Sequence, residues 1–170
     1  MRKLLFFILL FSFLWTVSIY LSQFEDKTQY GNLASESGLE NSNELAEIDY
    51  VVDGDTLKLK NGEKVRLLGI NAPENGTCYF NEATNYLKIL VNNSNIRLES
   101  DTLNSDRDKY GRLLRYVYVG DLDVNEKMVK DGYAEYYENY DVLKSNEYLS
   151  SEDYAKKNSL GLWKNCLNSV

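Results

Sequence analysis

Histidine is absent from this 170-residue sequence. Histidine is the usual general base beside a serine or cysteine nucleophile and the commonest protein ligand of metal ions such as zinc. Its absence therefore excludes catalytic triads, His–Cys pairs and nuclease sites that depend on histidine. Any chemistry on this chain must use carboxylates, arginine, lysine, tyrosine or a metal ion held through oxygen ligands.

Cysteine and positive charge are also scarce. The two cysteines, Cys78 and Cys166, are too few for a zinc site and too far apart for a CxxC redox motif. Lysine and arginine number 19 against 26 acidic residues, which gives a net charge of −7. The chain as a whole would repel nucleic acid, so any anion site must be local and made by a few arginines or a bound cation.

The first 22 residues have the pattern of a signal peptide or an N-terminal membrane anchor. Residues 4–21 carry no charge and follow Arg2-Lys3. As a helix they would extend about 27 Å, close to the hydrocarbon thickness of a bilayer. Residues 18–22 offer no small-residue cleavage site, so both possibilities stay open, and the terminal position argues against a buried core helix. Either one predicts export, with the rest of the chain extracellular or anchored to the outer face of the membrane.

Residues 23–45 are polar and acidic, with five acids, one lysine and no periodicity, which predicts a flexible tether. The remainder, residues 46–170, has the length of one domain. Hydrophobic residues form 44% of the whole chain, and 14 tyrosines against six phenylalanines favour a strand-rich fold.

Periodicity within residues 46–170 predicts an α+β domain. Alternating runs predict strands, and helical spacing predicts three helices. The expected strands are 46–52, 55–60, 64–68, 96–99 and 112–119, and the expected helices are 82–91, 124–132 and 147–159. Asn61-Gly62 is a strong two-residue hairpin signal between the second and third strands. Three strands, a helix, two strands and two helices suit a five-stranded OB-type barrel with packed helices.

Four short segments carry the residues suited to chemistry: VVDGDT (51–56), RLLGINAPE (66–74), DKYGR (108–112) and GLWKNC (161–166). Each alone has an ordinary structural explanation. Asp-Gly is a common turn, an arginine in an alternating strand can face solvent, and Pro-Glu can begin a helix. In this order and at this spacing, however, the segments resemble the staphylococcal nuclease (thermonuclease) family from about Glu47 to Lys164.

The resemblance implies a five-stranded OB barrel with three helices and a calcium-dependent endonuclease. Such an enzyme hydrolyses DNA and RNA with little sequence specificity, prefers single strands or frayed duplex, and leaves 3′-phosphate and 5′-hydroxyl ends. We expect a monomer whose partners are DNA and RNA and whose N-terminal segment contacts the membrane. The alternatives are a non-catalytic OB-fold module that binds nucleic acid or protein, and an anchored adhesion or scaffold domain.

The resemblance also implies a calcium site. Asp55, Asn71 and the backbone carbonyl of Ala72 match the metal-binding positions, and Asp53 and Thr56 match neighbours that orient the site. Calcium takes about six to eight oxygen ligands, so water and a substrate phosphate would complete the set. Asn71 stands where the family pattern has aspartate, which predicts weaker calcium binding because one negative charge is lost.

The catalytic trio implied by the resemblance is complete. Glu74 matches the general base that activates water, and Arg66 and Arg112 match the pair that holds the phosphate. A planar guanidinium suits this task because it can donate to two phosphate oxygens at once.

Three further residues match substrate-binding positions: Lys109, Tyr110 and Tyr140. For Tyr140 the alternative is a surface tyrosine without a role in binding, because the surrounding EYYENYDV is acidic where the family is often basic. The resemblance further implies a disulfide between Cys78 and Cys166. Its alternative is two free thiols in a reducing compartment, against which the predicted export segment argues.

Overall fold

The computed structural model of the chain describes residues 44–92 and 94–166. The predicted signal or anchor segment and the predicted tether up to residue 43 lie outside these residues. Within the described ranges, no helix is both long enough and apolar enough to cross a membrane. Strand β1 (Glu44–Asp53) starts two residues before the predicted beginning of the domain.

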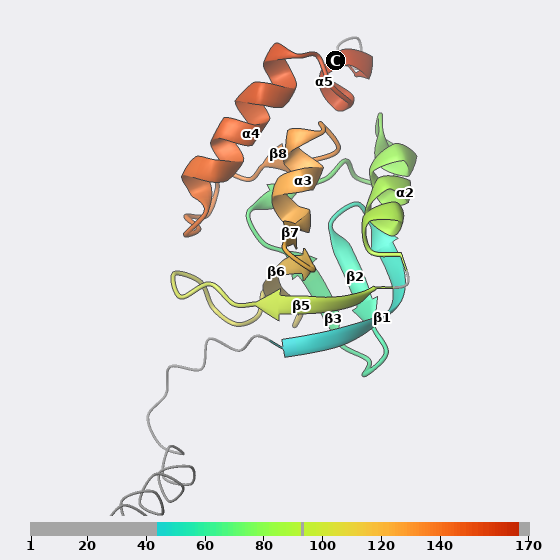
Figure 1. Cartoon of the computed structure of the whole chain (residues 1–170), viewed down its shortest axis with the longest axis vertical. Helices are drawn as coiled ribbons and strands as arrows, with labels where there is room; N and C mark the ends of the chain where they lie inside the picture. The colour runs from blue at the N-terminus through green and yellow to red at the C-terminus, as the bar shows by residue number, and fades with distance from the viewer. Residues whose placement is uncertain (1–43, 93, 167–170) are drawn as a thin grey trace, which may run out of the picture. The chain divides into compact units, whose positions relative to one another are not determined.

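A barrel of five strands forms the lower part of the coloured domain in Figure 1. Its other strands are β2 (Thr56–Leu59), β3 (Lys64–Leu67), β5 (Asn95–Glu99) and β6 (Leu113–Val119). The order is β3-β2-β1-β5-β6 with antiparallel neighbours, and a parallel pairing between β3 and β6 closes the barrel. A two-residue strand, β7 (Leu122–Asp123), folds back on the end of β6. The predicted five-stranded OB-type barrel is confirmed.

Local sequence features explain how the barrel bends. Gly62 has a φ of +92° and lies in the predicted turn between β2 and β3, but residues 60–63 separate the two strands, so the turn is longer than the predicted two residues. Strand β1 has irregularities in its pairing between Ile48 and Tyr50 and between Val51 and Asp53. Such irregularities increase the local twist, and β1 accordingly pairs with β5 along its first half and with β2 along its second half.

Helices cover one end of the barrel. They are α2 (Phe80–Leu90), α3 (Val124–Lys130), α4 (Ser145–Lys157) and the short α5 (Leu162–Asn165). Helix α3 lies between α2 and α4, and it packs on both (Figure 1). The three predicted helices are present. Two of them, α2 and α4, start two residues earlier than the spacing suggested, and α5 is too short to show helical periodicity.

Buried polar residues join the helices to the barrel. The Asn125 side chain on α3 accepts a hydrogen bond from the N–H of Val117 (3.0 Å) and donates to the carbonyl oxygens of Leu68 (2.9 Å) and Arg115 (3.2 Å). It is fully buried, so every one of these bonds replaces a lost contact with water. The chain just beyond β3 is thereby held at a defined distance from β6.

A second, small sheet was not predicted. It pairs β4 (Ile70–Asn71) with β8 (Glu135–Tyr136) in antiparallel fashion. The buried Glu152 of α4 accepts a hydrogen bond from the N–H of Tyr136 at 3.0 Å, which fixes β8 to the helix. Two residues cannot display alternation, so the sequence gives no periodic signal for either strand.

Candidate active site

A cleft of about 540 Å³ opens beside the barrel and gathers residues from three of the four sequence motifs. Its lining includes nine of the predicted site residues, namely Asp53, Asp55, Arg66, Asn71, Glu74, Lys109, Tyr110, Arg112 and Tyr140. Ala72 and Thr56 do not line it, but both are buried and contact Asp55. Trp163 of the fourth motif lies elsewhere, beneath the ammonium group of Lys156, which is 4.5 Å from its ring, and so has a structural role.

Asp55 lies at the floor of the cleft with 7% of its surface exposed. Its Oδ2 accepts a hydrogen bond from the N–H of Ala72 (2.9 Å) and lies 3.1 Å from the Arg66 guanidinium, and its Oδ1 accepts from the Thr56 hydroxyl (3.1 Å). Asp53 accepts a hydrogen bond from the N–H of Asp55 at 3.1 Å, which holds the turn. Burial raises the pKa of Asp55 to about 6, although Arg66 and the hydrogen bonds oppose that rise.

Gly54, between the two aspartates, is required for close packing. A Cβ atom at this position would lie 2.6 Å from the Cβ of Ala72 and 2.9 Å from the Cβ of Ala83. These distances are shorter than van der Waals contact, so only glycine lets the loop that carries Ala72 close over Asp55. The Asp-Gly-Asp segment is therefore more than an ordinary turn.

The closure of the barrel brings Arg66 and Arg112 to the same cleft. Arg66 lies on β3, which pairs in parallel with β6, and Arg112 directly precedes β6. Only 14% of the Arg66 side chain is exposed, and it donates to the carbonyl oxygen of Leu67 at 2.6 Å in addition to its ion pair with Asp55. Arg112 donates to Thr56 Oγ1 at 3.3 Å. Two guanidinium groups, one from β3 and one from the turn before β6, thus reach one site.

Asp108 orients Arg112 and was not among the predicted site residues. Its Oδ2 accepts from Arg112 Nε at 2.7 Å, and its Oδ1 accepts from the N–H groups of Tyr110 (2.9 Å) and Arg112 (3.0 Å). Burial opposes ionisation, but these donors hold the pKa of Asp108 below its usual value. The signal that could have identified it is the Asp–Arg spacing of four residues within DKYGR.

Lys109 and Tyr110 project from the same turn. Tyr110 is 73% exposed, with Lys109 Nζ 5.0 Å and the Arg112 guanidinium 5.5 Å from its ring centroid. Lys109 has no carboxylate within ion-pairing distance among residues 44–92 and 94–166. Its charge is therefore available to an anion in the cleft.

Glu74 is exposed on the loop that follows Pro73. The N–H and the hydroxyl of Thr77 both donate to the Glu74 carbonyl oxygen, at 3.0 and 2.7 Å, and so form a tight turn. In the described part of the chain, no hydrogen bond or ion pair involves the Glu74 carboxylate, which leaves it free to accept a proton.

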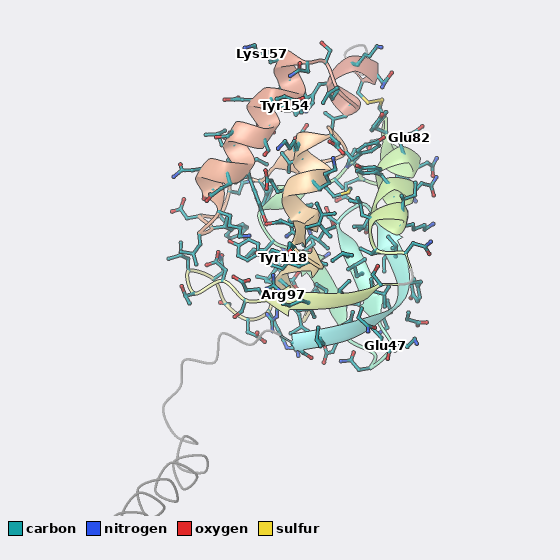
Figure 2. All side chains as sticks on the ribbon, viewed as in Figure 1. Glu47, Glu82, Arg97, Tyr118, Tyr154 and Lys157 are labelled. Atoms are coloured by element: carbon teal, nitrogen blue, oxygen red, sulfur yellow. A yellow bond between two sulfur atoms is a disulfide. The ribbon has the colours of Figure 1, made fainter. Side chains whose placement is uncertain are left out.

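The same loop carries Cys78, which forms a disulfide with Cys166 just after α5. The yellow bond near α5 in Figure 2 marks it. The pairing implied by the resemblance is therefore present in the structure. It ties the C-terminal end of the described chain to the loop that bears Glu74.

Tyr140 lies at the mouth of the cleft and is 61% exposed. A second tyrosine, Tyr137, also lines the cleft, and its ring centroid lies 5.7 Å from that of Tyr140. Tyr137 was missed because the segment EYYENYDV contains three tyrosines and no spacing that distinguishes them.

The donor atoms at the cleft floor suit a hard divalent cation. Asp55 supplies a buried carboxylate, and Asn71, a residue with an amide oxygen, also lines the cleft. No cluster of three or more Asp, Glu, Cys or His side chains suited to a metal occurs in the described ranges, so a cation would also need ligands from water and a substrate phosphate. Protein sites for zinc and copper are built mainly on histidine and cysteine, and neither residue lines this cleft.

The family model described as "Staphylococcal nuclease homologue" matches residues 64–165. The chain is 37% identical over 127 residues to "Endonuclease YncB" of Bacillus subtilis (strain 168), which covers 68% of this chain and 60% of that protein. It is also 37% identical over 127 residues to "SPbeta prophage-derived endonuclease YokF" of the same organism, covering 68% of this chain and 43% of that protein. The chain thus spans less than two thirds of each of these two relatives.

"Thermonuclease" of Staphylococcus hyicus is 33% identical over 142 residues, which cover 76% of this chain and 82% of that protein. The family match spans more than half of the chain, and the matched segment includes Arg66, Glu74 and Arg112. The closed five-stranded barrel and the cleft that contains these three residues are consistent with this family. The chain belongs to the staphylococcal nuclease homologue family.

Proposed function

We propose that the protein is a calcium-dependent endonuclease that hydrolyses phosphodiester bonds of DNA and RNA with little sequence specificity and prefers single strands. One observation carries the proposal: Arg66, Glu74 and Arg112 line the same cleft as the buried carboxylate of Asp55. Family membership and the printed names of the relatives, endonuclease and thermonuclease, support the same activity.

Asp55, Asn71 and the backbone carbonyl of Ala72 are the groups that would hold the calcium ion, with Asp53 and Thr56 orienting Asp55. A bound calcium ion supplies positive charge beside the phosphate. The raised pKa of Asp55 indicates that its buried charge is only partly compensated by Arg66, which suits an additional cation.

The side chains have separate roles in hydrolysis. Arg66 and Arg112 bind the phosphate and stabilise the charge that grows on its oxygens. Glu74 accepts a proton from the attacking water while the water oxygen bonds to phosphorus. The bond from phosphorus to the 5′ oxygen breaks, that oxygen takes up a proton from solvent, and the products are a 3′-phosphate and a 5′-hydroxyl.

Cleavage of a fluorescent single-stranded DNA by the full chain, with calcium and with excess chelator, tests the activity and its metal requirement. Glu74→Gln should lower kcat by about two orders of magnitude or more, because glutamine cannot accept the proton. Glu82→Gln is the matched control, since Glu82 is also exposed but lies on α2 and does not line the cleft. Equal activity of both variants would contradict the assignment of Glu74, and activity that survives chelation would contradict the calcium requirement.

The non-catalytic binding module is the less favoured function. A module that only binds single strands needs a basic groove, whereas this cleft mixes Asp53, Asp55 and Glu74 with its arginines. We also propose that the protein is exported, because the apolar segment at residues 4–21 is typical of secretion and the disulfide suits an oxidising compartment.

A further inference from the structure

Strands β2 and β3 carry a row of polar and basic side chains on the outer face of the barrel. In their antiparallel register Thr56 lies opposite Arg66, and Lys58 lies opposite Lys64. The residues that alternate with these four are no more than 1% exposed, namely Leu57, Leu59, Val65 and Leu67. Successive side chains of a strand point to opposite faces of the sheet. The row that contains Lys58 and Lys64, here called the lysine pair, therefore points out of the barrel.

This row continues directly from the cleft. Arg66 lines the cleft, and Lys64 lies two residues before it on β3. Positions i and i+2 of a strand are about 6.6 Å apart, which is close to the separation of neighbouring phosphates in an extended nucleic acid strand. Figure 1 shows the turn that joins β2 to β3 at the end of the barrel away from the helices. A strand bound in the cleft can therefore extend along the lysine pair.

The lysine pair has no structural explanation in its surroundings. Like charges directly opposite each other on paired strands reduce stability. Across residues 44–92 and 94–166, neither ammonium group forms an ion pair that would offset this repulsion. Lys58 donates a hydrogen bond to the carbonyl oxygen of Gly62, whereas the exposed Lys64 has no hydrogen bond from its side chain in the same ranges. Both charges are thus available to an anion.

The carboxylates beside the lysine pair are already neutralised. Glu63, in the turn between β2 and β3, accepts two hydrogen bonds from the Arg107 guanidinium, at 2.7 and 3.2 Å. Asp106, in the loop that precedes β6, lies 2.5 Å from the guanidinium of the buried Arg115. With these carboxylates paired, the uncompensated charge around the hairpin is positive.

The arginines of the cleft, by contrast, are themselves ion-paired. Arg66 lies 3.1 Å from Asp55, and Arg112 lies 2.7 Å from Asp108. The whole chain carries a net charge of −7, which repels a polyanion. Binding of a long nucleic acid strand therefore requires unpaired positive charge beyond the cleft, and the lysine pair supplies it.

We propose that Lys58 and Lys64 form a second phosphate-binding site, which holds the backbone of a nucleic acid strand on one side of the phosphate bound at Arg66 and Arg112. This assignment rests on the proposed function, because its ligand is the strand that the cleft would cut. The lysines contact phosphates and read no base, so the site serves DNA and RNA alike. It favours strands of several nucleotides over a dinucleotide, whose one phosphate occupies the cleft.

The salt dependence of binding counts the phosphates that the lysine pair contacts. Every protein in the test is the full chain with Glu74→Gln, and calcium is present. Fluorescence anisotropy gives the Kd of a labelled thymidine octanucleotide, and competition gives that of the dinucleotide, over about 50 to 200 mM salt. Each phosphate contact of a single strand adds about 0.7 to the slope of log Kd against log salt concentration.

Lys58→Gln combined with Lys64→Gln should lower that slope by about 1.4 for the octanucleotide. A fourfold rise in salt should then weaken its binding about sevenfold less than in the parent protein. The slope for the dinucleotide should stay unchanged, because its phosphate does not reach the lysine pair.

Two further variants separate phosphate contact from general charge and from folding. Lys88→Gln combined with Lys157→Gln removes the same charge from α2 and α4, where both lysines are exposed and without ion pairs in the described ranges, and should keep the parent slope. Lys64→Gln alone breaks no side-chain hydrogen bond and should lower the octanucleotide slope by about 0.7.

Three results would overturn the second phosphate site. They are an unchanged octanucleotide slope in the double variant of the lysine pair, an equal change for the dinucleotide, and an equal change in the variant of α2 and α4. Failure of the protein with Glu74 to cleave DNA would overturn the proposed function instead, and the slopes would still report on the lysine pair.

Discussion

Removal of the disulfide should destabilise the domain chiefly through the unfolded state. The bond joins residues 88 positions apart, so it closes a loop that spans most of the described chain. In the chain-entropy model a loop of this length restricts the unfolded ensemble by about 4 to 5 kcal/mol at 25 °C. Cys78→Ser combined with Cys166→Ser should lower the free energy of unfolding by an amount close to this.

The folded state should change little in the same variant. Helix α5 has other attachments, since the N–H of Leu162 donates to the carbonyl oxygen of Gly132 at 2.8 Å and the Leu162 side chain is buried. The turn at Glu74 is closed by its own hydrogen bonds from Thr77. Activity per folded molecule should therefore be nearly retained under conditions in which the variant is folded.

Urea denaturation followed by tyrosine and tryptophan fluorescence measures the effect. With a slope of about 1.5 kcal/mol per molar urea, the midpoint should fall by about 3 M. Wild-type protein in reducing agent is the control, and its urea midpoint should equal that of the double serine variant. A loss below about 1 kcal/mol would refute the reasoning, because the loop-closure term would then be missing.

Four other outcomes are expected. Arg66→Ala and Arg112→Ala should each lower kcat by about two to three orders of magnitude in a cleavage assay while the Tm of Arg112→Ala moves little, and near-normal kcat would contradict their role at the phosphate. Asn71→Asp should lower the calcium concentration for half-maximal activity, because it adds a charged ligand, and an unchanged value would place Asn71 outside the metal site. Gly54→Ala should cost about 1 to 3 kcal/mol in urea denaturation, since its Cβ would overlap two alanine Cβ atoms, whereas a neutral effect would mean that the loop moves freely. Asp108 has a lowered pKa in the folded state, so it adds stability above its unfolded pKa near 3.8 that is lost as pH falls further. In Asp108→Asn, the free energy of unfolding should therefore decrease less steeply below about pH 4 than in the wild type. The same pH dependence in both proteins would show that Asp108 makes no such contribution.

The barrel was predictable because its strands are long enough to show strand patterns and the hairpin between β2 and β3 carries Asn61-Gly62. The seven residues of β6, LLRYVYV, are recognisable as a strand by their valines and tyrosines, whereas the two-residue strands β4 and β8 exist only through tertiary contacts such as the bond from Tyr136 to Glu152. The parallel pairing of β3 with β6 joins residues far apart in the chain, and no local pattern encodes it.

The site residues also divide into those that a local sequence pattern reveals and those that it does not. Those within contiguous motifs, such as Asp55, Glu74 and Arg112, were predicted and do line one cleft. Asp108 was missed although it lies within the DKYGR motif, because its role is to orient Arg112. Tyr137 was missed because nothing in its segment distinguishes it from the neighbouring tyrosines. The export segment and the tether stay predictions, since they lie outside the described residues.

The parallel closure of the barrel has a consequence for when the cleft exists. Arg66 and Arg112 come together only when β3 pairs with β6, a contact between distant parts of the chain whose loop-closure entropy must be offset by other contacts. An incompletely folded chain therefore holds its two guanidinium groups apart and has no phosphate site. The arginine pair is therefore a property of the finished barrel and not of either strand alone.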